Sequence, residues 1–253
     1  MKILQTAFLL LVLAVSTVRA EEENRYDLLG RMLHPFANLL AETTTSPNRA
    51  LRLVGRIEVL SDAPPGAVGS RAELEVEYPD KLRLHGPVLG EDVTLCRHGQ
   101  DVWAFPGSKI EPLLAAAVSK KKLPKMDPSG KLPNFSLPIP EKELVFLPAL
   151  FQIKDVGSEP LDGANCRVMD VFLMPQLAKR LKDWGARVWV HSDATPARLS
   201  LAHGPWSLVV RFEAVEFSPH LPESTWEPTP EQSADVLKLD PEKYQRLLGA
   251  MVK

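Results

Sequence analysis

Arg71-Ala72-Glu73-Leu74-Glu75-Val76-Glu77 carries the clearest structural signal in this sequence of 253 residues. Apolar side chains occupy every second position of this stretch, and carboxylates occupy the positions between them. Successive side chains of a β-strand point to opposite faces, so the alternation predicts a strand with one apolar and one charged face. The stretch therefore favours a sheet that is only half buried.

The same period of two continues on both sides of this stretch. Ile57 and Val59 alternate with Arg56 and Glu58, and residues 63–66 (Ala-Pro-Pro-Gly) supply turn material. Strands are predicted at residues 53–59, 72–77, 81–85, 93–98, 101–105, 151–156, 166–173, 186–191, 198–202 and 206–217. Consecutive short strands of this kind predict a mainly antiparallel fold, either a large curved sheet or an open barrel.

Helices are predicted at the edges of the sheet, where they should pack on it. The first is a helical stripe near the amino terminus, with Pro35 as a kink or break. The second runs from Pro175 to Trp184. Residues 229–253 should add carboxy-terminal helices, through a capping box at residues 229–232 and a helix that begins at residues 240–241. The two stripes comprise Tyr26, Leu29, Leu33, Phe36 and Leu40, and Tyr244, Leu247, Leu248 and Met251.

Residues 119–143 fit neither period. Lysines and prolines alternate through this segment, and the prolines prevent a regular helix or a central strand. We expect a long loop, which can be a functional lid or a disordered segment. Its lysines can meet anionic headgroups or can simply be solvated.

The first 20 residues have the features of a signal peptide. Lys2 precedes an apolar run from Phe8 to Val15, and small side chains stand at Val18 and Ala20. We expect cleavage near Ala20, export to the periplasm, and one domain over residues 21–253. Removing residues 1–20 leaves 28 basic and 32 acidic residues, a net charge of −4, so nucleic acid is not expected as a partner.

Two cysteines, Cys96 and Cys166, lie about seventy residues apart in predicted strands. In an oxidising compartment they can form one disulfide, or they can pack as two buried thiols. Short catalytic signatures, metal-binding motifs and phosphate-binding loops are missing from the sequence, and its six histidines are scattered singly. We expect no catalytic residue, metal or cofactor, although a hydrolase site assembled only in the fold remains an alternative.

Large apolar side chains recur on the predicted strands. They can fill a core, or they can line a hollow for an acyl chain in a barrel or half-barrel. The chain supplies Trp103, Phe105, Phe151, Phe172, Trp189, Trp206, Phe212 and Phe217 at such positions.

Several stretches, in order, resemble the LolA-like superfamily of periplasmic lipoprotein carriers and lipid-binding relatives. They are Val54-Gly55-Arg56-Ile57-Glu58-Val59, Tyr78-Pro79-Asp80-Lys81-Leu82-Arg83-Leu84, Gly99-Gln100-Asp101-Val102-Trp103-Ala104-Phe105, Val188-Trp189-Val190-His191 with Thr195-Pro196-Ala197-Arg198-Leu199, and Phe212-Glu213-Ala214-Val215-Glu216-Phe217-Ser218-Pro219 with Leu221-Pro222. The likeness spans residues 53–226. The loop at residues 119–143, the carboxy-terminal extension and Pro35 depart from the family pattern.

The resemblance implies an unclosed antiparallel β-barrel, or strongly curved sheet, wrapped around helices with an apolar cavity for lipid. It implies that Arg83 acts as a latch that holds a helical lid closed; the alternative is a solvated strand arginine. The candidate cavity residues are Ile57, Val59, Leu74, Val76, Leu82, Leu84, Leu95, Trp103, Phe105, Phe172 and Phe212.

These features predict a monomeric periplasmic carrier that shields acyl chains of a lipoprotein or lipid for transfer between envelope membranes. The alternative is a non-catalytic interaction or sensor module of the same fold. Such a module would contact an envelope membrane protein through the Lys-rich loop.

Overall fold

The computed structural model describes residues 25–41, 45–88, 91–117, 131–135, 141–174, 184–244 and 247. The predicted signal peptide lies outside these residues, as does the helix predicted from Pro175 except for Trp184, which begins a strand. Among the described residues, no helix is long and apolar enough to cross a membrane.

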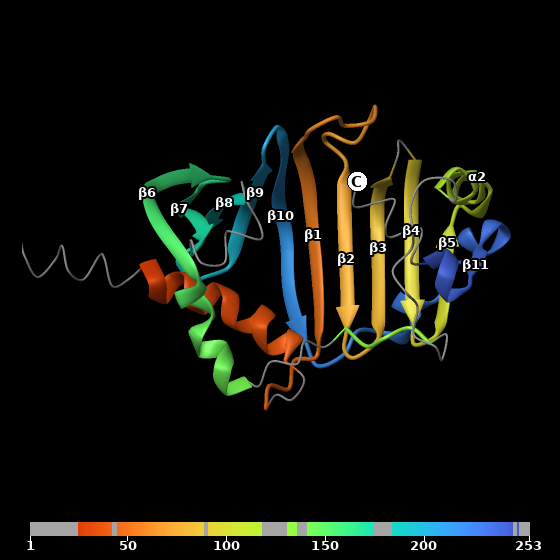
Figure 1. Ribbon diagram of the computed structural model, residues 1–253, viewed down its shortest axis with the longest axis horizontal. Coiled ribbons are helices and arrows are strands. Elements are labelled where there is room, and N and C mark those ends of the chain that lie inside the picture. Colours follow the sequence, from red (N-terminus) through yellow and green to blue (C-terminus); the bar gives the residue numbers. More distant parts are fainter. Residues whose placement is uncertain are drawn as a thin grey trace, which may run out of the picture.

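The described residues form one antiparallel sheet of eleven strands in the order β11-β5-β4-β3-β2-β1-β10-β9-β8-β7-β6 (Figure 1). The strands are β1 (Ala50–Leu60), β2 (Arg71–Glu77), β3 (Lys81–Val88), β4 (Glu91–His98), β5 (Asp101–Phe105), β6 (Phe151–Leu161), β7 (Ala164–Leu173), β8 (Trp184–Val190), β9 (Pro196–His203), β10 (Trp206–Ser218) and β11 (Leu237–Leu239). Because β6 and β11 are separate edges, the sheet is not closed. This confirms the predicted fold class, and all ten predicted strands are present.

Alternation along the strands gives the sheet two chemically different faces. The register places Leu53 opposite Leu74, Leu74 opposite Leu84, and Leu84 opposite Leu95, so these leucines form one row across four strands. We call the face that carries this row the inner face. The neighbouring row on the outer face consists of Glu216, Arg52, Glu75 and Arg83.

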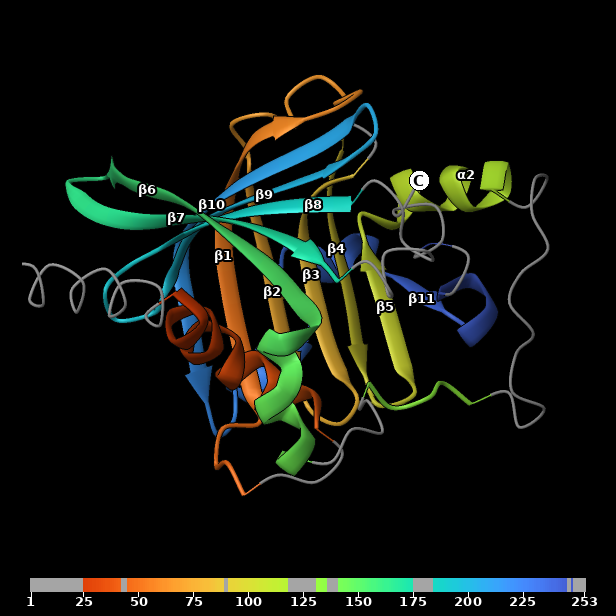
Figure 2. The same cartoon turned by 60° about the vertical axis from the view of Figure 1, so that its left-hand side comes forward.

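One flank of the inner face is covered by a helix at residues 25–40 (Figure 2). Its first half packs Leu29 and Met32 on β6 to β8, and its second half packs Leu39 on Leu51 of β1. The helix runs through Pro35, so of the predicted kink or break the break does not occur. A proline inside a helix costs about 3 kcal/mol, and packing of both halves on the same sheet offsets that cost.

The opposite flank of the inner face is covered by α2 (Gly107–Ala117), which was not predicted. Ile110 and Leu114 of α2 pack on β4 and β5 together with Leu132, Tyr244 and Leu247. Residues 241–244 and 247 are helical, which agrees with the helix predicted to begin at residues 240–241. The α2 segment contains Pro112, which weakens its intrinsic helical tendency, so the helix depends on this tertiary packing.

The carboxy-terminal extension differs from the predicted run of helices. The capping box forms, because Gln232 accepts from the Thr229 amide at 3.0 Å and the Gln232 amide donates to Thr229 at 3.3 Å. It opens only the short 3₁₀ turn η3 (Gln232–Asp235), and the edge strand β11 follows. Pairing of Leu237 and Leu239 with β5 favours the strand over a continued helix.

Part of the segment predicted as a loop is docked on the sheet. Of residues 119–143, the structure describes 131–135 and 141–143, and the latter begin the 3₁₀ helix η1 (Glu141–Leu150). The Leu132 amide donates to Gln100 Oε1 at 2.9 Å, and the Phe135 amide donates to the Pro79 carbonyl at 2.9 Å. These bonds hold residues 131–135 against the ends of the central strands.

Candidate functional site

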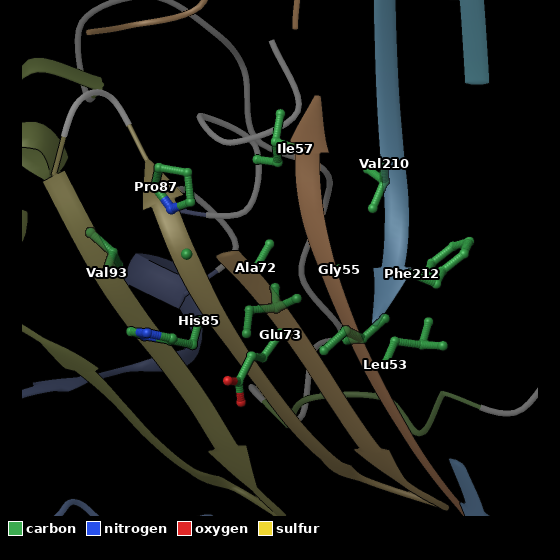
Figure 3. Close-up of a pocket in the computed structure, with 13 residues that line it drawn as sticks. Leu53, Gly55, Ile57, Ala72, Glu73, His85, Pro87, Val93, Val210 and Phe212 are labelled. Atoms are coloured by element: carbon green, nitrogen blue, oxygen red, sulfur yellow. The ribbon is translucent and has the colours of Figure 1, made fainter. Parts of the chain in front are cut away.

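The centre of the inner face, between the two covered flanks, forms an open apolar trough of about 270 Å³ (Figure 3). It crosses β10, β1, β2, β3 and β4. The lining consists of Leu53, Gly55, Ile57, Ala72, Leu74, Leu84, Gly86, Pro87, Val93, Val210 and Phe212, with Glu73 and His85.

Small residues form the floor of the trough. Gly55 lies opposite Ala72, and Ala72 lies so close to Gly86 that a Cβ at residue 86 would come within 3.2 Å of the Ala72 Cβ. A Cβ at residue 55 would lie 2.6 Å from Val210 Cγ1, so close packing of β1 against β10 requires glycine there. The sheet is therefore bare of large side chains along this row.

The walls of the trough are apolar and only partly buried. Leu74, Leu84 and Phe212 retain part of their accessible surface, whereas Leu95, in the same row under α2, is fully buried. Partly exposed apolar walls around a bare floor favour an apolar guest, because contact with it would remove these side chains from water.

The two polar residues that line the trough have partners at its margin. Glu73 forms an ion pair with Arg71, with 3.1 Å between Glu73 Oε1 and Arg71 Nη1, and His85 Nδ1 lies 3.0 Å from the Thr94 hydroxyl. Both residues alternate with inner-face residues along their strands and so belong to the outer face. The inner surface of the trough itself is formed by hydrocarbon.

The structure brings four of the eleven predicted cavity residues together in the trough: Ile57, Leu74, Leu84 and Phe212. Val76, Leu82 and Leu95 share the inner face but not the trough. Val76 packs in the cluster under Leu39, Leu82 pairs with Val76, and Leu95 packs under α2.

The other four predicted cavity residues lie elsewhere. Trp103 and Phe105 pack on the outer face with Trp226, and the Trp103 indole donates to the Trp226 carbonyl at 3.0 Å. Phe172 and Val59 are 42% and 43% exposed. These four assignments are corrected because aromatic or β-branched character marks a strand but does not say which face each side chain joins.

Arg83 also lies on the outer face. Its guanidinium donates to Glu75 at 2.6 Å, whereas the helix at residues 25–40 packs on the inner face. This position does not fit the latch that the family resemblance implied.

Of the two alternatives for the cysteines, the disulfide is not formed: Cys96 and Cys166 are both free and buried. Cys96 packs with Trp103 and Trp226 beside β4, whereas Cys166 packs with Trp189 beside β7. The alternative of two packed thiols is therefore correct. Burial raises the pKa of the Cys96 thiol to about 12.

One thiol and one imidazole do approach each other. Cys166 Sγ lies 3.4 Å from His191 Nδ1, but Cys166 is fully buried and burial raises the pKa of its thiol. A nucleophilic cysteine needs the opposite environment, one that stabilises the thiolate. Among the described residues, no group of three or more His, Cys, Asp or Glu side chains is arranged to hold a metal ion.

The sequence pattern did not indicate the floor residues Gly55, Ala72 and Gly86, or Val210 on the wall. Glycine within an alternating strand is the signal that could have indicated the floor, because it commonly marks a bulge or a close backbone approach. The structure has a register shift between Val54 and Gly55. The sequence alone does not align the three small residues across neighbouring strands.

Comparison with solved structures finds several proteins of low sequence identity. The lipoprotein LppX of Mycobacterium tuberculosis aligns with 14% identity over 76% of this chain and 97% of its own, with a TM-score of 0.37. MucB of Pseudomonas aeruginosa, in complex with MucA, aligns with 15% identity over 85% of this chain and 63% of its own, with a TM-score of 0.40. A LolA superfamily protein of Nitrosomonas europaea aligns with 11% identity over 78% of this chain and 96% of its own, with a TM-score of 0.27.

No family model matches the sequence, and a search of curated proteins finds no match either. The open antiparallel sheet with helices on its inner face has the arrangement that the family resemblance in the sequence implies. At these identities and TM-scores, the alignments carry no conclusion about function.

Proposed function

We propose that this protein is a periplasmic binding protein that shelters an acyl chain of a lipid or lipoprotein in the inner-face trough and carries it between envelope membranes. The observation that supports the proposal most strongly is the apolar strip between two well-packed flanks, which no described residue covers. The proposal includes a signal peptide at residues 1–20, a single domain over residues 21–253, and action as a monomer without covalent chemistry.

The size of the trough suits part of one acyl chain. Its volume of about 270 Å³ is just below the range of about 300–1,000 Å³ that is usual for ligand pockets. Each methylene that leaves water for an apolar surface contributes roughly 0.8 kcal/mol. About ten methylenes, at roughly 0.8 kcal/mol each, would supply the roughly 8 kcal/mol of micromolar binding without any polar contact, and such binding is reversible enough for a carrier.

The first test is native mass spectrometry of protein purified from its own envelope. The expected result is a copurifying lipid or acylated protein, together with saturable binding of spin-labelled stearate by the delipidated chain. If no lipid copurifies and the delipidated chain does not bind stearate, the proposal is contradicted.

The second test fills the trough. Ala72→Leu places a branched side chain on the floor and displaces about two methylenes of the guest, which should weaken stearate binding about tenfold. Ala202→Leu, at an exposed position of β9, is the matched control and should leave binding unchanged. Equal effects of the two substitutions would show that the trough is not the site.

The same purification distinguishes the alternative function. An interaction or sensor module would yield one dominant envelope protein in crosslinking through lysines of residues 119–131, with no lipid in the mass spectrum.

A further inference from the structure

A second pocket, of about 250 Å³, lies between the 25–40 helix and the strands β6, β7 and β8. Its chemistry is the opposite of the trough's. The pocket is lined by Arg25 and Arg31 of the helix, Arg167 of β7 and His191 after β8, so three guanidinium-bearing residues and one histidine border it. It shares no lining residue with the trough.

We propose that this pocket binds a phosphate group, either free in solution or on the headgroup of a lipid. Phosphate presents several strong acceptor oxygens to a basic cluster, and guanidinium groups match it through parallel N–H donors. Ser158, Asn165 and Ser192 line the same pocket and add neutral polar groups that can bind the remaining oxygens.

Arg167 is held in a fixed orientation. Its guanidinium forms a two-point ion pair with Asp155 through Nε and Nη2. Asp155 in turn accepts from the Gly157 amide at 2.9 Å. Burial acts to raise the pKa of Asp155, but the bonds from Arg167 and Gly157 hold it below its ordinary value, so the carboxylate stays charged and positions Arg167.

Among the described residues, two carboxylates, Asp155 and Asp27, lie beside these three guanidinium groups. Asp155 balances Arg167, and Asp27 contacts Arg31 through a single bond at 3.0 Å to Nε. That pair is exposed on both sides, so it is worth little and the Arg31 side chain can turn to a ligand. Arg25, the third guanidinium group of the lining, also acts electrostatically on Asp155.

His191 can supply a further donor. The Cys166 thiol, 3.4 Å from His191 Nδ1, stays protonated because burial raises its pKa. A protonated thiol can donate to Nδ1, which places the proton of a neutral imidazole on Nε2. The buried thiol therefore has a structural use that involves no reaction of the sulfur.

The test measures binding of inorganic phosphate by titration calorimetry and binding of phosphatidylglycerol vesicles by sedimentation. Arg25→Gln/Arg31→Gln should weaken whichever binding the natural chain shows by about tenfold or more, because two charge-assisted contacts are lost. The control is Arg71→Gln, which removes the same charge from a side chain of matched exposure, 50% against 49% for Arg31, outside the pocket.

Phosphate binding that the double variant loses supports a free phosphate. Vesicle binding that the double variant loses, without binding of free phosphate, supports a lipid headgroup. If neither phosphate nor the vesicles bind, the proposal is overturned. An equal loss of binding in the Arg71→Gln control also overturns it. Arg25 is preceded in the sequence by Glu21, Glu22 and Glu23, so the titration is repeated after all three are changed to Gln; affinity that appears only then also overturns it. Thermal unfolding shows whether each variant is folded.

Discussion

The covered flank and the open centre of the inner face are built from the same residue types but differ in what lies on them. Leu74, Leu84 and Leu95 stand in one register row on three neighbouring strands. Leu95 is fully buried under α2 and the carboxy-terminal residues, whereas Leu74 is partly exposed in the trough. An apolar strand face becomes core or candidate binding site according to its cover.

The centre must therefore be held by something other than inner packing. On the outer face, Arg52 contacts Glu216 at 3.2 Å and Glu75 at 3.7 Å, and Glu75 contacts Arg83 at 2.6 Å. This charge ladder crosses β10, β1, β2 and β3 opposite the trough. It ties together the strands whose inner side chains have no cover within the part of the chain that the structure describes.

The largest difference is expected from truncating a leucine in each region. Leu95→Ala should lower the free energy of unfolding by about 2–5 kcal/mol, because it leaves a cavity under α2. Leu74→Ala should cost less than about 1.5 kcal/mol, since its side chain already contacts solvent, and should weaken stearate binding instead. Urea unfolding and stearate titration of both variants measure this. Equal destabilisation would mean that the trough is part of the core.

A smaller effect is expected from the charge ladder. Arg83→Gln removes the closest partner of the buried Glu75 carboxylate and should lower the free energy of unfolding by about 1–3 kcal/mol. Arg56→Gln, from a more exposed pair on the same face, is the control and should cost less than about 1 kcal/mol. Stearate affinity should not change in either variant. If stearate affinity changed in Arg83→Gln and not in Arg56→Gln, the result would support the latch role that the family resemblance implied.

The smallest effect concerns the strap of residues 219–236, which crosses the outer face. Burial acts to raise the pKa of Glu77, but the Leu221 amide at 2.8 Å and the Lys81 ammonium at 3.2 Å lower it below its ordinary value. A lowered folded-state pKa stabilises the protein above the unfolded pKa, and this contribution disappears as pH falls through the folded value.

Glu77→Gln should therefore cost about 1 kcal/mol near neutral pH and progressively less as the pH falls below about 4. Urea unfolding of both proteins across this range is the measurement. If the difference in the free energy of unfolding between the two proteins stays constant with pH, the charge of Glu77 does not hold the strap.

The fold was predictable because its signal is local. Ten strands followed from the alternation of apolar and charged residues, including β5, whose bounds are the predicted ones. Two of the elements that were missed, α2 and β11, are short or contain proline, and they gain their stability from contacts with distant strands. The helix at residues 25–40 continues through Pro35 for the same reason, because both of its halves pack on the sheet.

The candidate site was predictable only in part. Alternation placed Leu74 and Leu84 on an apolar face, but it could not separate them from Leu95, because all three occupy equivalent strand positions. The aromatic side chains of Trp103 and Phe105 pointed to a strand and were then assigned to the wrong face. A period of two gives the relative faces within one strand, and the registers between strands set which residues meet.

Local chemistry in the chain was enough to specify the strands, the polarity of their two faces and the absence of short catalytic motifs, because each depends on residues a few positions apart. The tertiary structure alone determined where the helices lie and which thiols stay apart. It also aligned Gly55, Ala72 and Gly86 into one floor. Those outcomes depend on register and packing between segments far apart in sequence, where small differences in buried area select one arrangement.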